Sequence, residues 1–179
     1  MNRNRKSRID VSFVAVLIVV LATLAGCSAA TRPADLAVAT TPVASSSPLA
    51  GQVRLVRLAG NQADDPLWTP ELDSTGFVTA LAHSLADAGY LAPDPDKATV
   101  VVTATVERLD QPLKGINYEV TSKVRYTVSA NGEIRDIPIV ATGSASLVDH
   151  VVAAERLRIA SERAVKANIR AFLDRLAAW

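Results

Sequence analysis

The stretch "YEVTSKVRYTVSANGE" (118–133) decides the fold. Apolar and polar side chains alternate along it, which predicts a strand over 118–130 with one buried face. The apolar face carries Val120, Val124, Tyr126 and Val128, and the polar face carries Glu119, Thr121, Lys123, Arg125 and Thr127. Asn131-Gly132 follows, and this dipeptide is the strongest short-range signal for a β-hairpin. The sequence therefore predicts an antiparallel pair at the centre of the domain.

Three further strands surround this hairpin signal. The stretch "IPIVATGSASLV" (137–148) is the expected return strand, and Pro138 favours an edge position or a bulge near its start. On the other side, "TVVVTATVERL" (99–109) is rich in β-branched residues, and "QVRLVRLAG" (52–60) is the expected first strand. The sequence thus predicts four strands.

Two amphipathic helices complete the pattern. The first is predicted from near Ser74, an N-cap residue, to Gly89, a residue suited to the position after a helix. The second covers about 150–177, with a buried stripe of Leu157, Ala164, Val165, Ile169, Phe172 and Leu176. Ser161 and Asn168 fall on that stripe. Either they hydrogen-bond to the sheet, or they mark a seam where another molecule packs.

The order of elements is β-α-β-β-β-α, with one apolar sheet face and two helices that each carry one apolar stripe. The simplest arrangement is an α+β two-layer sandwich, in which both helices cover the apolar face of a four-stranded sheet. The opposite face is then left for solvent or for a partner. We expect its central residues to form a partner surface: Thr121, Lys123, Arg125 and Thr127.

The N-terminus has the organisation of a secretion signal. Residues 1–8 carry four basic side chains and no acid, and an apolar run of about 15 residues follows from Val11. A membrane-spanning helix needs about 20 residues, so a permanent transmembrane anchor is the weaker interpretation. The run ends in "LAGC" (24–27), whose Cys27 is the single cysteine of the 179-residue chain and has no disulfide partner.

This ending resembles the lipobox of bacterial lipoproteins. The resemblance implies cleavage between Gly26 and Cys27, acylation of Cys27, and membrane attachment through it. In such lipoproteins an aspartate directly after the cysteine commonly causes retention in the inner membrane. Ser28 occupies that position here, so in a cell with two membranes the resemblance implies the periplasmic face of the outer membrane. Removal of residues 1–26 takes four basic residues and Asp10 from 19 basic and 18 acidic ones, leaving 15 and 17 and a net charge of −2. Nucleic acid is therefore not expected as a partner.

The composition predicts three parts: a signal peptide (1–26), the lipidated cysteine with an Ala/Ser/Thr/Pro tether (27–50), and one domain (51–179). Behind a lipobox, the element order of the domain resembles small envelope lipoproteins, such as the lipopolysaccharide-assembly lipoprotein and auxiliary lipoproteins of lipid-transporting ABC systems. That resemblance implies a non-catalytic accessory or assembly subunit with a membrane-protein partner.

Residues that could carry chemistry are few. His83 is expected in solvent, and Asp149-His150 is expected to open the last helix rather than to form a dyad. Phosphate-loop, zinc and nucleophile motifs are absent from the sequence, so we expect no cofactor, no metal and no enzyme activity. The alternatives are a lipoprotein that binds lipid, glycan or peptidoglycan by itself, and an envelope enzyme without a linear motif.

The last helix also carries more basic than acidic residues. These side chains form either a solvated face or a contact for anionic lipid or glycolipid head groups. The residues are Arg156, Arg158, Arg163, Lys166, Arg170 and Arg175.

Overall fold

The computed structural model describes residues 36–39, 42–57, 74–112 and 115–179, except the side chains of residues 57, 74 and 75. The chain divides into two compact units, 1–30 and 31–179, and every described residue belongs to the second unit. The predictions for Gly26 and Cys27 lie outside the described residues.

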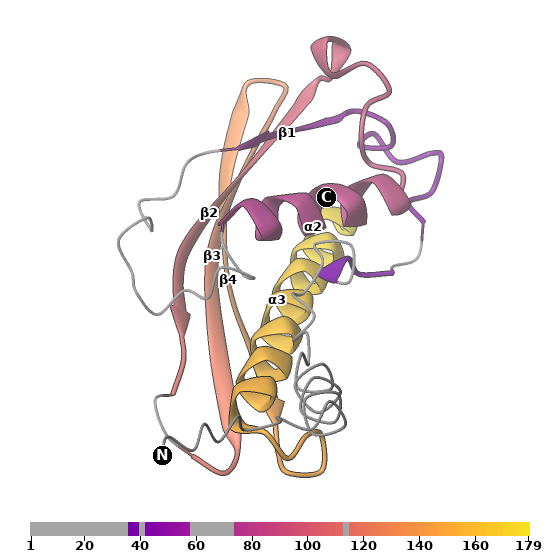
Figure 1. The fold of residues 1–179 in the computed structure, drawn as a ribbon. Helices are drawn as coiled ribbons and strands as arrows, with labels where there is room; N and C mark the ends of the chain where they lie inside the picture. Colours follow the sequence, from indigo (N-terminus) through magenta and orange to yellow (C-terminus); the bar gives the residue numbers. More distant parts are fainter. Residues whose placement is uncertain (1–35, 40–41, 58–73, 113–114) are drawn as a thin grey trace, which may run out of the picture. The chain divides into compact units, whose positions relative to one another are not determined.

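The second unit is the predicted α+β two-layer sandwich (Figure 1). Its four-stranded sheet has the order β1-β2-β3-β4, with β1 parallel to β2 and the other neighbours antiparallel. The two long helices lie on one face of this sheet, and a short 3₁₀ turn, η3, precedes β2. The elements are β1 (Val53–Arg57), α2 (Ser74–Asp87), η3 (Pro95–Lys97), β2 (Val100–Asp110), β3 (Tyr118–Ala130), β4 (Glu133–Ala145) and α3 (Ala153–Ala177).

The β3–β4 hairpin follows the sequence signal. Asn131 and Gly132 both adopt positive φ, at 52° and 80°, as a tight two-residue hairpin turn requires. Because the turn is so short, Ala130 already pairs with Glu133, and β4 covers 133–145 rather than the predicted 137–148. Pro138 lies in β4, an edge strand of the described sheet, as predicted.

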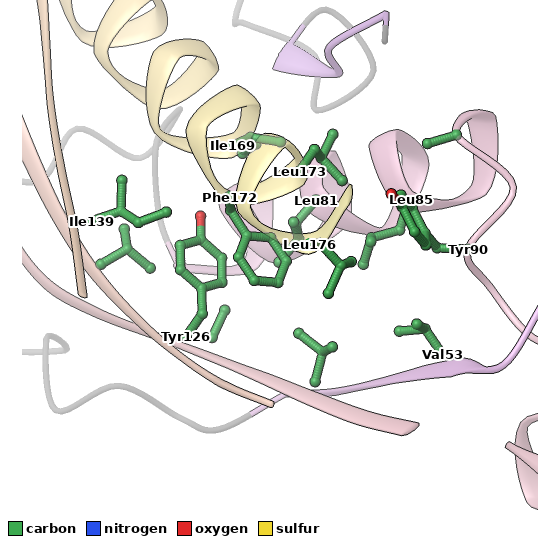
Figure 2. Packing of buried hydrophobic residues seen from close by; sticks show 14 of the residues in the cluster. Val53, Leu81, Leu85, Tyr90, Tyr126, Ile139, Ile169, Phe172, Leu173 and Leu176 are labelled. Atoms are coloured by element: carbon green, nitrogen blue, oxygen red, sulfur yellow. The ribbon is translucent and has the colours of Figure 1, made fainter. Parts of the chain in front are cut away.

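Helix α3 packs against the inner faces of β3 and β4 with unusually close backbone contact at one point. A Cβ on Gly143 would overlap the backbone N of Ala164 and the backbone O of Ala160. Glycine is therefore the residue that lets α3 sit directly on β4. Farther along, the ring of Tyr126 stacks on that of Phe172 at 3.9 Å between centroids and an interplanar angle of 3° (Figure 2).

Most of the predicted apolar stripes are confirmed. Phe77, Leu81 and Leu85 of α2 are buried, and so are the predicted residues of α3 except Leu157, which is half-buried. Helix α2 begins at Ser74, and Gly89 has a φ of 80°, as its predicted position after the helix requires. The core in Figure 2 thus joins both helices to the sheet.

The predicted tether differs from the structure over residues 36–39 and 42–50. Leu36, Val38 and Leu49 are buried in the main core. The segment also bonds to the backbone beyond α2, through Val43 N–H to the Ala88 carbonyl at 2.8 Å. The composition of 28–50 is low in large apolar residues, but a few aliphatic side chains spaced along it are enough to close the core beside α2. The domain therefore starts before residue 51.

Candidate functional site

The predicted partner surface lies on the outer sheet face, opposite the helices. The four side chains of Thr121, Lys123, Arg125 and Thr127 occupy alternate positions of β3 and are half-buried or exposed. Both long helices pack on the other face, so no helix of the described residues covers these four.

The cations of this surface are paired with acids on the neighbouring strand. Lys123 Nζ lies 3.4 Å from Asp110 Oδ2, and Arg125 Nη2 lies 2.7 Å from Glu107 Oε1. The Thr127 hydroxyl donates to Asp136 Oδ1 at 2.7 Å. The surface is therefore polar and close to neutral, and each exposed pair contributes less than about 1 kcal/mol to stability.

The two histidines lie on different elements: His83 is in α2 and His150 is in the loop before α3. His83 is exposed on α2, as predicted. The predicted helix-opening role of Asp149 is wrong, because α3 begins at Ala153. Asp149 instead closes the preceding turn: it accepts from the backbone N–H of Ser146 at 2.8 Å and pairs with Arg163 at 2.7 Å. His150 Nδ1 accepts the Val152 N–H at 3.1 Å.

The Arg163 guanidinium has a clear electrostatic effect on this turn. Its hydrogen bond, with help from the Ser146 backbone N–H, lowers the pKa of Asp149 to about 2. The carboxylate is thus charged at neutral pH and serves as a structural acceptor for the turn rather than as a proton carrier.

The polar residues of the α3 stripe bond across to the sheet, the first of the two possibilities left by the sequence. Asn168 Nδ2 donates to the Ser122 carbonyl and the Ile139 carbonyl, each at 3.2 Å, and Asn168 Oδ1 accepts the Tyr126 hydroxyl at 2.9 Å. Ser161 accepts from Gln111 at 3.1 Å. Burial raises the pKa of Tyr126 well above its usual value. The bonds of Asn168 hold the helix on the sheet and are buried, whereas the Ser161–Gln111 bond is only partly buried.

One member of the basic group on α3 is not on a solvated face. Arg156 is buried, and its Nη1 donates to the carbonyls of His150 at 3.0 Å and Val151 at 2.8 Å. Its guanidinium carbon also lies 5.6 Å from the centre of the Tyr118 ring. Arg156 therefore fixes the loop before α3, and Arg158 is engaged by Glu155 and Glu162.

The remaining cations of the middle of α3 border a cavity of about 430 Å³. The residues around it are Ala37, Val38, Ala39, Arg163, Lys166, Ala167 and Arg170. Sequence reasoning missed this cavity because one wall comes from residues 37–39, which were predicted to be tether. The excess of basic residues on the helix was the only available signal.

A second feature that sequence reasoning missed is an apolar end of the sheet. Tyr118 pairs with Ala145, so the loop before β3 and the loop after β4 lie at the same end. Between half and nearly all of each large apolar side chain there is exposed. We call this set the apolar end: Ile116, Leu147, Val148, Val151 and Val152. The sequence pattern instead predicts a strand at Leu147 and Val148 and a helix at Val151 and Val152, whereas β4 ends at Ala145 and α3 begins at Ala153.

Within the described ranges, no group of three or more His, Cys, Asp or Glu side chains could hold a metal ion. Nor is any helix of those ranges long and apolar enough to cross a membrane.

No protein-family model and no curated protein matches the chain. Solved structures do. A crystal structure described as a "putative lipoprotein" from Caulobacter crescentus CB15 matches with a TM-score of 0.50 and 16% identity, over 73% of this chain and 92% of that chain. The hypothetical protein CT253 from Chlamydia trachomatis has a TM-score of 0.44 and 14% identity, over 71% and 95%. The first of these likenesses shows that the fold of this chain occurs in another protein.

Proposed function

We propose that the protein is a lipid-anchored lipoprotein of the cell envelope, acylated at Cys27, that acts as a non-catalytic accessory or assembly subunit. The support is the basic, apolar and "LAGC" sequence of the N-terminus, together with a fold shared with a protein described as a lipoprotein. In this proposal the partner is a membrane protein of a complex that transports lipid or lipopolysaccharide. Ser28 after Cys27 favours the periplasmic face of the outer membrane.

The observation that carries a partner-binding role is the apolar end. Val148 is 97% exposed and Val151 is 79% exposed, and three further aliphatic side chains stand at the same end of the sheet. Grouped aliphatic residues in water are typical of a protein or membrane contact site. Arg156 bonds to the carbonyls of His150 and Val151 and so holds the loop after β4, which carries all of these side chains except Ile116.

The polar sheet face remains the second candidate for the same partner. Its Lys123 and Arg125 are engaged within the protein, so a partner there has to replace Asp110 and Glu107 or accept both members of each pair. Such replacement gives specificity rather than a large gain in affinity.

The test is site-specific photo-crosslinking in intact cells, with the probe placed at Val148, at Thr121, or at exposed Arg54 as a control position. We expect a discrete membrane-protein adduct from Val148, or from Thr121 if the sheet face is the contact, and none from Arg54. With the probe kept at Val148, the substitutions Leu147→Ser and Val151→Ser should weaken or remove the adduct while the protein stays folded, because both side chains are exposed. Equal, diffuse labelling from all three positions would contradict the accessory role.

A further inference from the structure

The cavity on α3 is an open depression in the surface, and its lining is partly apolar and partly cationic. We call the apolar lining, from residues 37–39 and Ala167, the floor, and the cationic lining, from Arg163, Lys166 and Arg170 about one helical turn apart, the rim. The cavity volume of about 430 Å³ is within the range of sites for small molecules, about 300–1,000 Å³. The cavity can therefore take a small group with both polar and apolar parts.

The charges of the rim are only partly neutralised. Arg163 is engaged, because it pairs with Asp149 at 2.7 Å and donates to the Ser144 carbonyl at 2.6 Å. Within the described ranges, Lys166 and Arg170 have no carboxylate at ion-pair distance. Two cations beside one cavity favour an anionic ligand, and an apolar floor favours one that carries carbon as well.

The covalent chain limits how far this cavity lies from the proposed lipid anchor, and this step rests on the proposed function. Leu36 is fully buried in the core, and it is nine residues from Cys27. Nine residues span at most about 30 Å, whatever their conformation. The residues that follow Leu36 line the cavity itself. The covalent chain therefore keeps the cavity near enough to the anchor for this side of α3 to reach the bilayer surface.

We propose that this cavity binds the phosphate-bearing head group of an anionic lipid in the membrane that holds the anchor. Lys166 and Arg170 contact the phosphate, and the alanine and valine side chains contact the glycerol carbons. Because α3 packs on the inner face of the sheet, binding of its outward side to the bilayer turns the polar sheet face away from the membrane. The domain is thereby oriented, and not merely tethered.

The test uses the mature chain, 27–179, with Cys27→Ser so that no acyl chain contributes. This chain contains the whole compact unit from residue 31 onwards. Sedimentation is measured with vesicles of phosphatidylcholine alone and of phosphatidylcholine with phosphatidylglycerol. We expect binding only to the second kind. Each cation at an anionic surface contributes about fivefold to binding, so Lys166→Gln with Arg170→Gln should weaken binding by about 30-fold.

A matched control separates this site from general charge. Arg54→Gln with Arg175→Gln removes the same charge from exposed positions outside the cavity, and should weaken binding less than about threefold. An equal loss in both double variants, or no binding that depends on phosphatidylglycerol, would overturn the proposal. A second measurement is an NMR titration with soluble glycerol phosphate, followed by the amide chemical shifts of residues 166 and 167. An affinity for glycerol phosphate equal to that for the lipid would also overturn the proposal, since the ligand would then be a free anion.

The assay also separates this proposal from the lipid anchor. The vesicle assay contains no acylated protein, so an unacylated Cys27 in cells refutes the anchor and leaves the vesicle result standing. Conversely, an acylated Cys27 with no vesicle binding by the mature chain refutes the head-group site alone.

Discussion

We expect Tyr126 and Asn168, whose side chains are hydrogen-bonded, to show the largest energetic coupling of any side-chain pair at the helix–sheet interface. Asn168 is fully buried and makes hydrogen bonds of 3.2 Å to two sheet carbonyls and of 2.9 Å to the Tyr126 hydroxyl. Asn168→Ala leaves these groups without a partner and opens a small cavity. An orphaned buried polar group costs about 1–3 kcal/mol, so we expect a loss of about 3–5 kcal/mol in the free energy of unfolding.

A double-mutant cycle tests whether the hydrogen bond between Tyr126 and Asn168 causes part of this loss, which the total loss in Asn168→Ala does not show. Tyr126→Phe removes only the hydroxyl and should cost about 1–2 kcal/mol, because Asn168 Oδ1 then lacks its donor. In the Asn168→Ala background the same change should cost close to nothing, since the hydroxyl is already orphaned. Urea unfolding of the four proteins should therefore give a coupling energy above about 1 kcal/mol. Additive effects, within about 0.5 kcal/mol, would refute the reasoning.

Three further predictions concern packing, the α3 stripe and pH. Gly143→Ala should lower the free energy of unfolding by about 1–3 kcal/mol, since a methyl group there overlaps the backbone of α3; a thermal melt measures this. Phe172→Asp should prevent stable folding, whereas Lys166→Ala should change the melting temperature little, because only the first side chain is fully buried. The folded-state pKa of Asp149 is about 2 against an ordinary 3.8, so its stabilising effect should be present above about pH 4 and be lost as the pH falls through 2. Comparison with Asp149→Asn over that pH window measures this effect.

Each of these has an outcome that counts against the structure. A neutral Gly143→Ala would mean that α3 does not approach β4 as closely as described. Equal melting temperatures for the Phe172 and Lys166 variants would place the wrong face of α3 on the sheet. A wild-type protein that gains stability relative to Asp149→Asn on acidification would reverse the sign of the Arg163 interaction.

The sheet and both helices could be predicted because their signals are local. Alternation in 118–130 and the Asn131-Gly132 turn determine β3 and its partner, and the stripe around Phe172 orients α3. Even Asn168 was placed correctly on the buried stripe, although its hydrogen-bond partners lie 29 to 46 residues away in the chain. Periodicity identifies which residues face inward but not which atoms they meet.

The functional surfaces depend on contacts that no local pattern contains. Val38 packs beside α2 and α3 because its own backbone N–H bonds to Ser84 Oγ at 2.9 Å, 46 residues away. The composition of residues 28–50 as a whole predicts a tether, so it indicates neither that contact nor the cavity wall that residues 37–39 form. Arg156 was grouped with solvated cations for a similar reason: its acceptors are carbonyls of the loop before α3, and that loop was predicted to be helix.

The central claim is that the mature protein begins at an acylated Cys27, and mass spectrometry of the N-terminal peptide from isolated membranes tests it most directly. We expect a peptide that starts at Cys27 and carries a diacylglycerol thioether, and a Cys27→Ser protein that leaves the membrane fraction. A peptide that extends upstream of Cys27, or that starts there with a free thiol, would contradict it.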